Sequence, residues 1–131
     1  MEAYWNGLHG ARKILANSPD LVHKPSHMDA EIRNAQGEKL DYAYHSAQGD
    51  CPFTVIIGHG VTANMNRPFV EALAKGLAMA GIPTLRFSFS GNGDSEGRFE
   101  DACVSKEAED LGAVIDAVKA KGRRVAYVGH S

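Results

Sequence analysis

The stretch Arg123-Arg-Val-Ala-Tyr-Val-Gly-His-Ser131 decides how the rest of the sequence is interpreted. It is an apolar, β-forming run that stops at Gly129, His130 and Ser131. In the motif G-x-S-x-G, a strand turns sharply into a helix and exposes its serine at the bend. A glycine two residues before the serine leaves room for neighbouring backbone. The stretch therefore predicts the first half of such an elbow, with Gly129 shaping the turn and Ser131 as the candidate nucleophile.

Three apolar runs predict the strands of a parallel sheet. Each is followed by a glycine, and they are residues 53–57, 84–90 and 125–128. The first run is apolar throughout, which is typical of a parallel strand covered on both faces. In the second run apolar and polar residues alternate, so that Leu85, Phe87 and Phe89 are expected on one face. An earlier pair of segments, 30–35 and 40–45, predicts an antiparallel hairpin.

Two amphipathic helices are predicted between these strands. Asn66 is expected to be the N-cap of the first helix, with Pro68 in its first turn and Gly81 at its end. Ser105 is expected to cap the second helix, which ends at Gly122. Acidic residues are expected at the positive end of the second helix, namely Glu107, Glu109 and Asp110. The order β-α-β-α-β predicts an α/β fold with a mostly parallel sheet and helices on its faces.

The composition is that of a globular domain. The chain has 131 residues, 44% of them hydrophobic, and a net charge of −2, which argues against nucleic acid as the main partner. No apolar run approaches the length of a membrane span, about 18 residues. Cys51 and Cys103 lack C-x-x-C spacing, so neither a zinc site nor a disulfide framework is indicated. No metal and no cofactor are expected. The N-terminus lacks a signal-peptide pattern, and a cytoplasmic protein is predicted. Residues 1–27 are expected to be an extension or linker, and 28–131 the domain.

The loop 58–64, with the sequence Gly-His-Gly-Val-Thr-Ala-Asn, carries the second candidate for chemistry. Acyl transfer places negative charge on a carbonyl oxygen, so backbone N–H donors must already point at that oxygen. The N–H of Val61 is the candidate donor of this oxyanion hole. His59 and Gly60 are expected to shape the turn, an interpretation that we favour for His59 over a role in proton transfer.

The glycine-rich loop 91–97 invites comparison with nucleotide-binding loops. Its G-x-G is followed by three residues rather than two before the next glycine, so it does not meet the dinucleotide-binding fingerprint. We predict instead a tight loop at the rim of the site, in which Asp94 and Ser95 bond to backbone groups.

In this order, the motifs are similar to those of α/β-hydrolases. They read H-G-V-T-A-N at 59–64, R-F-S-F-S-G-N-G-D-S-E-G-R-F at 86–99 and Y-V-G-H-S at 127–131. The resemblance covers residues 30–131 and is strongest to the feruloyl or cinnamoyl esterase and serine-aminopeptidase-like (monoacylglycerol-lipase-like) branch. It implies the α/β-hydrolase fold, with an antiparallel first hairpin and strand order 1-2-4-3-5. Ser88 stands where the family usually has Asp, and Asn92 where it often has His.

The resemblance implies a serine hydrolase of small-molecule esters that works through an acyl-enzyme. Ser131 would be the nucleophile and the Val61 N–H an oxyanion donor. In these hydrolases the acid and the histidine of the triad follow the serine, whereas all six histidines here precede it. His130 is expected to point away from Ser131 and to be a poor base. We therefore expect the N-terminal half of an α/β-hydrolase, truncated at the elbow, inactive alone and completed by a complementary C-terminal segment.

A second hypothesis belongs to a different class of protein. It is a non-catalytic α/β-hydrolase remnant, or interaction module, that binds a partner through an open sheet edge. The strand 125–128 would form that uncovered apolar edge, so aggregation or pairing is expected for the segment expressed alone. The coding sequence after Ser131 discriminates the two. A continuation with x-G, then an Asp and a His, supports the enzyme, and an in-frame stop supports the remnant.

Overall fold

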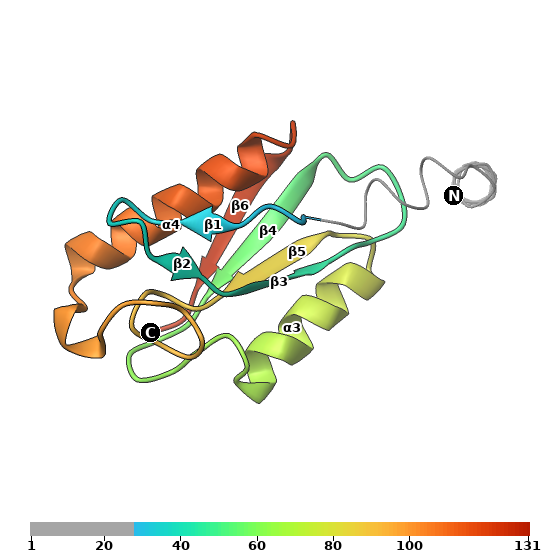
Figure 1. The fold of residues 1–131 in the computed structure, drawn as a ribbon. Helices are drawn as coiled ribbons and strands as arrows, with labels where there is room; N and C mark the ends of the chain where they lie inside the picture. Colours follow the sequence, from blue (N-terminus) through green and yellow to red (C-terminus); the bar gives the residue numbers. More distant parts are fainter. Residues whose placement is uncertain (1–27) are drawn as a thin grey trace, which may run out of the picture.

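The computed structural model describes residues 28–131 (Figure 1). The expectation that 1–27 form an extension or linker lies outside the described residues. The elements in chain order are β1 (Ile32–Arg33), β2 (Lys39–Leu40), β3 (Tyr42–His45), β4 (Phe53–Gly58), α3 (Pro68–Met79), β5 (Thr84–Phe87), the 3-10 helix η1 (Phe99–Asp101), α4 (Val104–Lys119) and β6 (Arg124–Gly129).

Four strands form the main sheet, in the order β3-β5-β4-β6. Strand β4 pairs in parallel with both β5 and β6, and β3 pairs antiparallel with β5. Strands β1 and β2 form a separate antiparallel pair. The predicted α/β-hydrolase fold class is thus confirmed, including the order of its second, fourth, third and fifth strands. The difference is that the second predicted strand is broken into β2 and β3.

The break falls at Asp41 because a distant loop uses its backbone. The Ser88 N–H donates to the Asp41 carbonyl at 3.0 Å, and the Asp41 N–H donates to Ser95 Oγ at 2.8 Å. The first bond continues the antiparallel register of β3 and β5, in which Asp41 stands opposite Ser88. The Asp41 N–H is diverted from that ladder, because Ser95 Oγ accepts it and itself donates to the Ser88 carbonyl at 2.7 Å. The alternation of apolar and polar residues in the sequence does not reveal these contacts, because they involve residues far from Asp41 along the chain.

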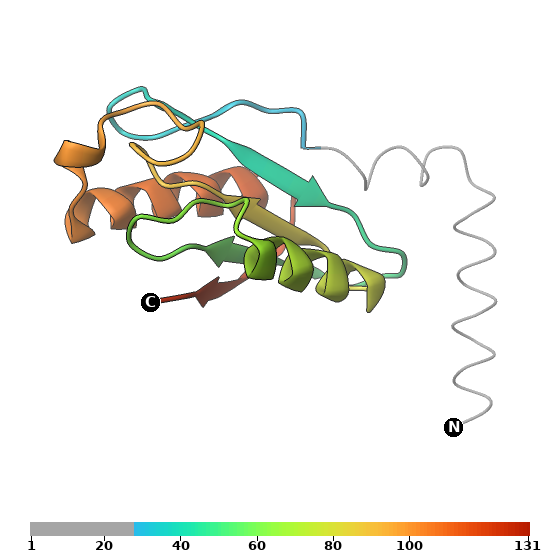
Figure 2. The same ribbon diagram turned by 90° about the horizontal axis from the view of Figure 1, so that it is seen from below.

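The main sheet lies between two helices, with α3 on one face and α4 on the other (Figures 1 and 2). Under α3, Val55 and Ile57 of β4 pack against Val70 and Ala74. The buried cluster on the other face consists of Ile32, Leu40, Ile56, Leu85, Phe87, Phe89, Val114 and Val118. Alternate residues of β4 therefore serve opposite faces, which explains why this strand is apolar apart from Thr54.

The end of α3 and the place of Pro68 in its first turn were predicted correctly, but the N-cap residue was not. Gly81, with a φ of 92°, donates its N–H to the Ala78 carbonyl at 3.0 Å and stops the helix. The N-cap is Arg67 rather than Asn66. Asn66 Oδ1 instead accepts a hydrogen bond at 2.9 Å from the buried side chain of Arg86.

The beginning of α4 also differs from the prediction. Its N-cap is Cys103, and Ser105 lies inside the helix. Of the three acidic residues assigned to the positive end, only Glu107 lies in the first turn. Asp110 is fully buried and accepts hydrogen bonds from Asn34 Nδ2 at 2.9 Å and from the Ser90 N–H at 2.8 Å. It therefore joins α4 to the hairpin and to the loop after β5.

Candidate active site

Three loops lie at the end of the sheet where the parallel strands end. They are residues 59–67 after β4, 88–98 after β5 and 130–131 after β6, and Figure 1 shows all three at the same end of the sheet. A Cβ built on Gly93 would lie 3.0 Å from the Asn64 Cβ, so the first two loops are in contact. Open α/β sheets bind ligands at this carboxyl edge, which makes it the candidate site.

Ser131 lies directly against Gly60. A Cβ built on Gly60 would come within 3.0 Å of the Ser131 Cβ and 3.1 Å of the His130 carbonyl oxygen. Only glycine permits so close an approach. Ser131 has a φ of 61°, in the left-handed region that residues with a side chain rarely adopt. Such local strain is typical of functional turns, including the serine of an elbow.

Val61 follows Gly60 on the same loop and is 72% exposed. The Ala63 N–H donates to the Gly60 carbonyl at 3.2 Å, which closes a turn around Val61 and Thr62. Within residues 28–131, no hydrogen bond uses the Val61 N–H. This N–H thus remains able to donate to a bound group, on a loop that touches Ser131.

His59 is buried and engaged at both ring nitrogens. Its Nδ1 lies 2.8 Å from the Gly60 carbonyl, to which it donates, and its Nε2 accepts from the Phe89 N–H at 3.0 Å. Both contacts suit the neutral ring, and burial lowers the pKa of His59 below its usual value. The geometry supports a role in shaping the loop, because neither nitrogen is left for proton transfer.

None of the histidines that the structure describes is poised to act on Ser131. The ring of His130 packs against Phe69 at the start of α3, with 4.6 Å between ring centroids. His45 lies in β3, where its Nε2 accepts from Arg86 Nε at 2.9 Å. Among residues 28–131, no hydrogen bond joins a histidine to Ser131.

Tyr127 covers the ends of the two strands that lead into the candidate site, a role that sequence reasoning missed. Its ring lies over Gly58 and Gly129, the paired last residues of β4 and β6. A Cβ on Gly58 would collide with the Tyr127 hydroxyl, and one on Gly129 would lie 3.0 Å from Cε2. Burial, and secondarily the charge of Glu107, raises the pKa of the Tyr127 hydroxyl. Gly58 and Gly129 indicate in the sequence that a large side chain lies over them. This is evident only once β4 and β6 are known to pair with these two glycines opposite each other.

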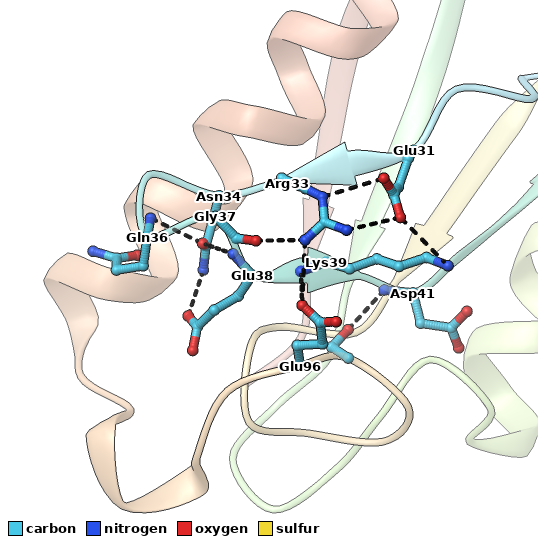
Figure 3. Close-up of polar contacts among 10 residues, drawn as sticks. Glu31, Arg33, Asn34, Gln36, Gly37, Glu38, Lys39, Asp41 and Glu96 are labelled. Atoms are coloured by element: carbon cyan, nitrogen blue, oxygen red, sulfur yellow. Dashed lines mark hydrogen bonds and ion pairs between the residues drawn. The ribbon is translucent and has the colours of Figure 1, made fainter.

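The glycine-rich loop is held onto the hairpin by polar contacts (Figure 3). Glu96 receives the Lys39 N–H on its carboxylate at 2.7 Å and donates its own N–H to the Lys39 carbonyl at 2.8 Å. Ser95 Oγ donates to the Ser88 carbonyl at 2.7 Å, as predicted for this serine. The prediction for Asp94 was wrong: its side chain forms no hydrogen bond within 28–131, and Glu96 takes that role.

Ser88 and Asn92, which depart from the family pattern, both stabilise these loops. Ser88 is buried, and its Oγ accepts from the Met65 N–H at 3.0 Å. Asn92 Nδ2 donates to the Ser90 carbonyl at 3.1 Å. Ser88 therefore bonds the loop after β4 to the end of β5, whereas Asn92 forms a bond within the loop after β5.

Two kinds of site are not found in the part of the chain that the structure describes. No three His, Cys, Asp or Glu side chains of residues 28–131 gather in a way that could hold a metal ion. No helix in this range is both long and apolar enough to cross a bilayer.

Comparisons with known proteins point to one class of protein. No protein-family model matches the chain. The curated palmitoyl-protein thioesterase ABHD10, mitochondrial, of Bos taurus is 27% identical over 112 residues, which are 82% of this chain and 36% of that protein. The chain therefore spans about a third of the length of this relative.

Two solved structures agree with the fold described above. An alpha-beta serine hydrolase homologue from Coxiella burnetii superposes with a TM-score of 0.68 at 30% identity, covering 81% of this chain and 52% of that one. Est1E from Butyrivibrio proteoclasticus, with ferulic acid bound, gives a TM-score of 0.67 at 29% identity over 78% and 43%. The predicted resemblance is confirmed: residues 28–131 have the α/β-hydrolase fold over part of its length, and the chain resembles proteins of this superfamily.

Proposed function

We propose that the protein is a serine hydrolase of carboxylic esters, with Ser131 as its nucleophile. The observation that carries the proposal is the contact between Ser131, in its left-handed conformation, and Gly60. This contact puts the candidate nucleophile beside the loop whose Val61 N–H has no partner within 28–131. A nucleophile and an oxyanion donor on adjoining turns is the arrangement that acyl transfer requires.

In the proposed reaction, Ser131 Oγ loses its proton to a general base and attacks the acyl carbon. The carbonyl oxygen becomes an oxyanion, to which the Val61 N–H donates a hydrogen bond. The tetrahedral intermediate collapses, the base returns the proton to the leaving alcohol, and the acyl group stays on Oγ. Water then attacks the acyl-enzyme by the same route and releases a carboxylic acid and free Ser131.

We assign the general base and its acid partner to residues outside the described range 28–131. His59 has both nitrogens bonded to backbone, and His130 packs on Phe69. An unassisted serine hydroxyl is a weak nucleophile, so turnover depends on those further residues. We extend this to the prediction that residues 28–131 alone are inactive.

The substrate is proposed as a small-molecule ester. The relative from Bos taurus is by name a palmitoyl-protein thioesterase, and Est1E was solved with ferulic acid bound. Esters and thioesters undergo the same attack at the acyl carbon, so the two are separated by assay of matched oxygen and sulfur substrates. The relative is mitochondrial by name, and a cytoplasmic location for this protein remains a prediction.

A fluorophosphonate probe tests the nucleophile on the protein encoded by the complete coding sequence, which we call the full-length protein. We expect covalent labelling, mapped by mass spectrometry to the peptide that contains Ser131 and abolished by Ser131→Ala. The matched control is Ser105→Ala, because Ser105 is an exposed serine of α4. Labelling that persists in Ser131→Ala would remove Ser131 from its proposed role, as would the absence of labelling in the complete folded protein.

The second candidate function, an interaction module, rests on strand β6. Among the described strands β6 pairs only with β4, and most of its residues are exposed, including Val128 at 40%. An open strand edge offers backbone groups and apolar side chains to a partner. If the full-length protein is unlabelled by the probe yet sediments as a stable complex that Val128→Lys dissolves, the interaction module is the better description.

A further inference from the structure

A cavity of about 310 Å³ lies at the end of the sheet away from the candidate active site. Thr54, at the start of β4, lines it, whereas Gly60 and Ser131 lie beyond the other end of the sheet. A strand of this length separates the two by about 20 Å. The cavity is therefore distinct from the site proposed for acyl transfer.

The lining combines an apolar body with positive charge. Met28, Tyr44 and Val118 supply apolar surface, and Lys121 and Arg123 supply two cations. No aspartate or glutamate of the described residues lines the cavity. A volume of this size falls at the lower end of the range for small-molecule sites, about 300–1,000 Å³.

Arg123 is held rigidly, so its cation is fixed in place. Its Nε donates to Thr54 Oγ1 at 3.2 Å and its Nη2 donates to the Phe53 carbonyl at 2.9 Å. No hydrogen bond within residues 28–131 uses Nη1, and Lys121 forms no ion pair with any of the described side chains. Lys121 is exposed and Arg123 is half-buried, so two cations without an acidic partner among the described residues are available to an anion at the wall of this cavity.

We propose that this cavity binds a small organic carboxylate, with its apolar part against Met28, Tyr44 and Val118 and its carboxylate against Lys121 and Arg123. A planar guanidinium already oriented by two bonds loses little freedom on binding a carboxylate, which favours recognition. The proposal does not depend on the proposed hydrolase activity, because none of the residues involved belongs to the active-site loops.

Cys51 provides a readout inside the cavity. It lines the cavity and its Sγ donates to the Phe53 carbonyl at 3.4 Å, whereas Cys103 is exposed at the N-cap of α4. A ligand in the cavity should shield Cys51 from a thiol reagent while leaving Cys103 unaffected. The two cysteines thus form an internal comparison in one sample.

The experiment uses phenylacetate as probe and phenylacetamide as its uncharged match, on the full-length Ser131→Ala protein. Alkylation by N-ethylmaleimide is followed at each cysteine by peptide mass spectrometry, and affinity is measured by isothermal titration. We expect phenylacetate to slow alkylation of Cys51 about tenfold at saturation with no change at Cys103, and phenylacetamide to bind at least about tenfold more weakly.

Variants locate the charge that matters. Lys121→Gln should weaken phenylacetate binding several-fold, and its matched control Lys119→Gln, an exposed lysine of α4 that does not line the cavity, should not. Arg123→Lys should weaken binding while keeping the charge, because the planar guanidinium is lost. Equal affinity for acid and amide, unchanged affinity in Lys121→Gln, or no heat and no protection up to about 10 mM probe would each overturn the proposal.

Discussion

The imidazole Nε2 of His59 accepts a hydrogen bond from the Phe89 N–H at 3.0 Å. The contact ties the loop after β4 to the loop after β5, and the same ring donates through Nδ1 to the Gly60 carbonyl. Since Gly60 touches Ser131, His59 acts on the candidate nucleophile only through the loop that it holds. This is why the residue that most resembles a catalytic histidine is proposed as a structural one.

Replacement of His59 tests this role. His59→Phe fills the same space but leaves the buried Phe89 N–H without a partner, so we expect a loss of about 1–3 kcal/mol in the free energy of unfolding. His59→Gln retains an acceptor and should recover part of that loss. Urea unfolding of the full-length protein measures both variants. Equal stability of the Phe and Gln variants would show that the hydrogen bond to Phe89 contributes little.

Stability should fall as the pH drops below about 6.5 because of His45 and His59. Burial is the main cause that lowers the pKa of both rings, and for His45 the charges of Arg86 and Lys75 add to it against an opposing effect of Glu71. The unfolded chain therefore takes up protons first, near pH 6.5, and the folded state loses stability until its own lowered pKa values are reached.

Unfolding free energies measured in steps from pH 7.5 to pH 5 check this expectation. Each ring can contribute a slope of at most about 1.4 kcal/mol per pH unit in that window. The comparison is the double variant His45→Gln, His59→Gln, whose slope should be shallower than that of the parent. Hydrogen-bonding and charged partners lower the pKa values of three carboxyl groups below 4.5, those of Glu31, Glu38 and Glu71. Protonation of these groups therefore reduces stability only below the pH range of this experiment. Parallel curves for parent and variant would contradict the assignment.

Gly60→Ala should reduce esterase activity far more than stability. The added methyl would lie 3.0 Å from the Ser131 Cβ and 3.1 Å from the His130 carbonyl oxygen, so the elbow must shift. A displacement of this kind at a reacting group costs on the order of 10²-fold in rate. The matched control is Gly76→Ala, in the middle of α3, where a Cβ meets nothing within 4 Å and should add about 0.5–1 kcal/mol of stability. kcat/KM on a p-nitrophenyl ester and the melting temperature are measured for both, and full activity in Gly60→Ala would count against the proposed site.

Asp110→Asn should destabilise the protein by about 1–3 kcal/mol. The fully buried carboxylate accepts from Asn34 Nδ2 and from the Ser90 N–H, and an amide nitrogen would set donor against donor at one of these contacts. Asp116→Asn, at an exposed position of the same helix, is the control and should change stability by less than about 0.5 kcal/mol. Chemical denaturation measures both, and similar values for the two variants would mean that the buried carboxylate is not a structural anchor.

Much of the architecture could be read from local patterns. The continuous apolar run of β4 predicted a strand covered on both faces, and α3 and α4 do lie on opposite faces of its sheet. Gly81 marked the end of α3 because a left-handed residue there is nearly always glycine. These signals are short-range, because each depends on residues that are neighbours in the sequence.

The helix beginnings and the polar core were beyond such reasoning. Asn66 and Ser105 were reasonable caps by residue type, but Asn66 is taken by Arg86 and Ser105 lies past the first residue of α4. Asp110 was assigned to the positive end of its helix by its position in the sequence, but it is fully buried and lies beyond the first turn. For Asn66 and Asp110 the deciding partner comes from another part of the chain, and local preference is overridden by a contact that forms only on folding.

The sequence by itself predicted the class of fold and the candidate nucleophile, because strand periodicity and the Gly-His-Ser turn are properties of neighbouring residues, and the resemblance of its motifs to those of α/β-hydrolases implied the order of strands in the sheet. Only the tertiary structure decided that Ser131 rests on Gly60, that Tyr127 covers Gly58 and Gly129, and that a cationic cavity lies at the far end of the sheet. These features join residues that are distant along the chain. They come together because the strands pair in one register, a result of the burial of both faces of the sheet at once.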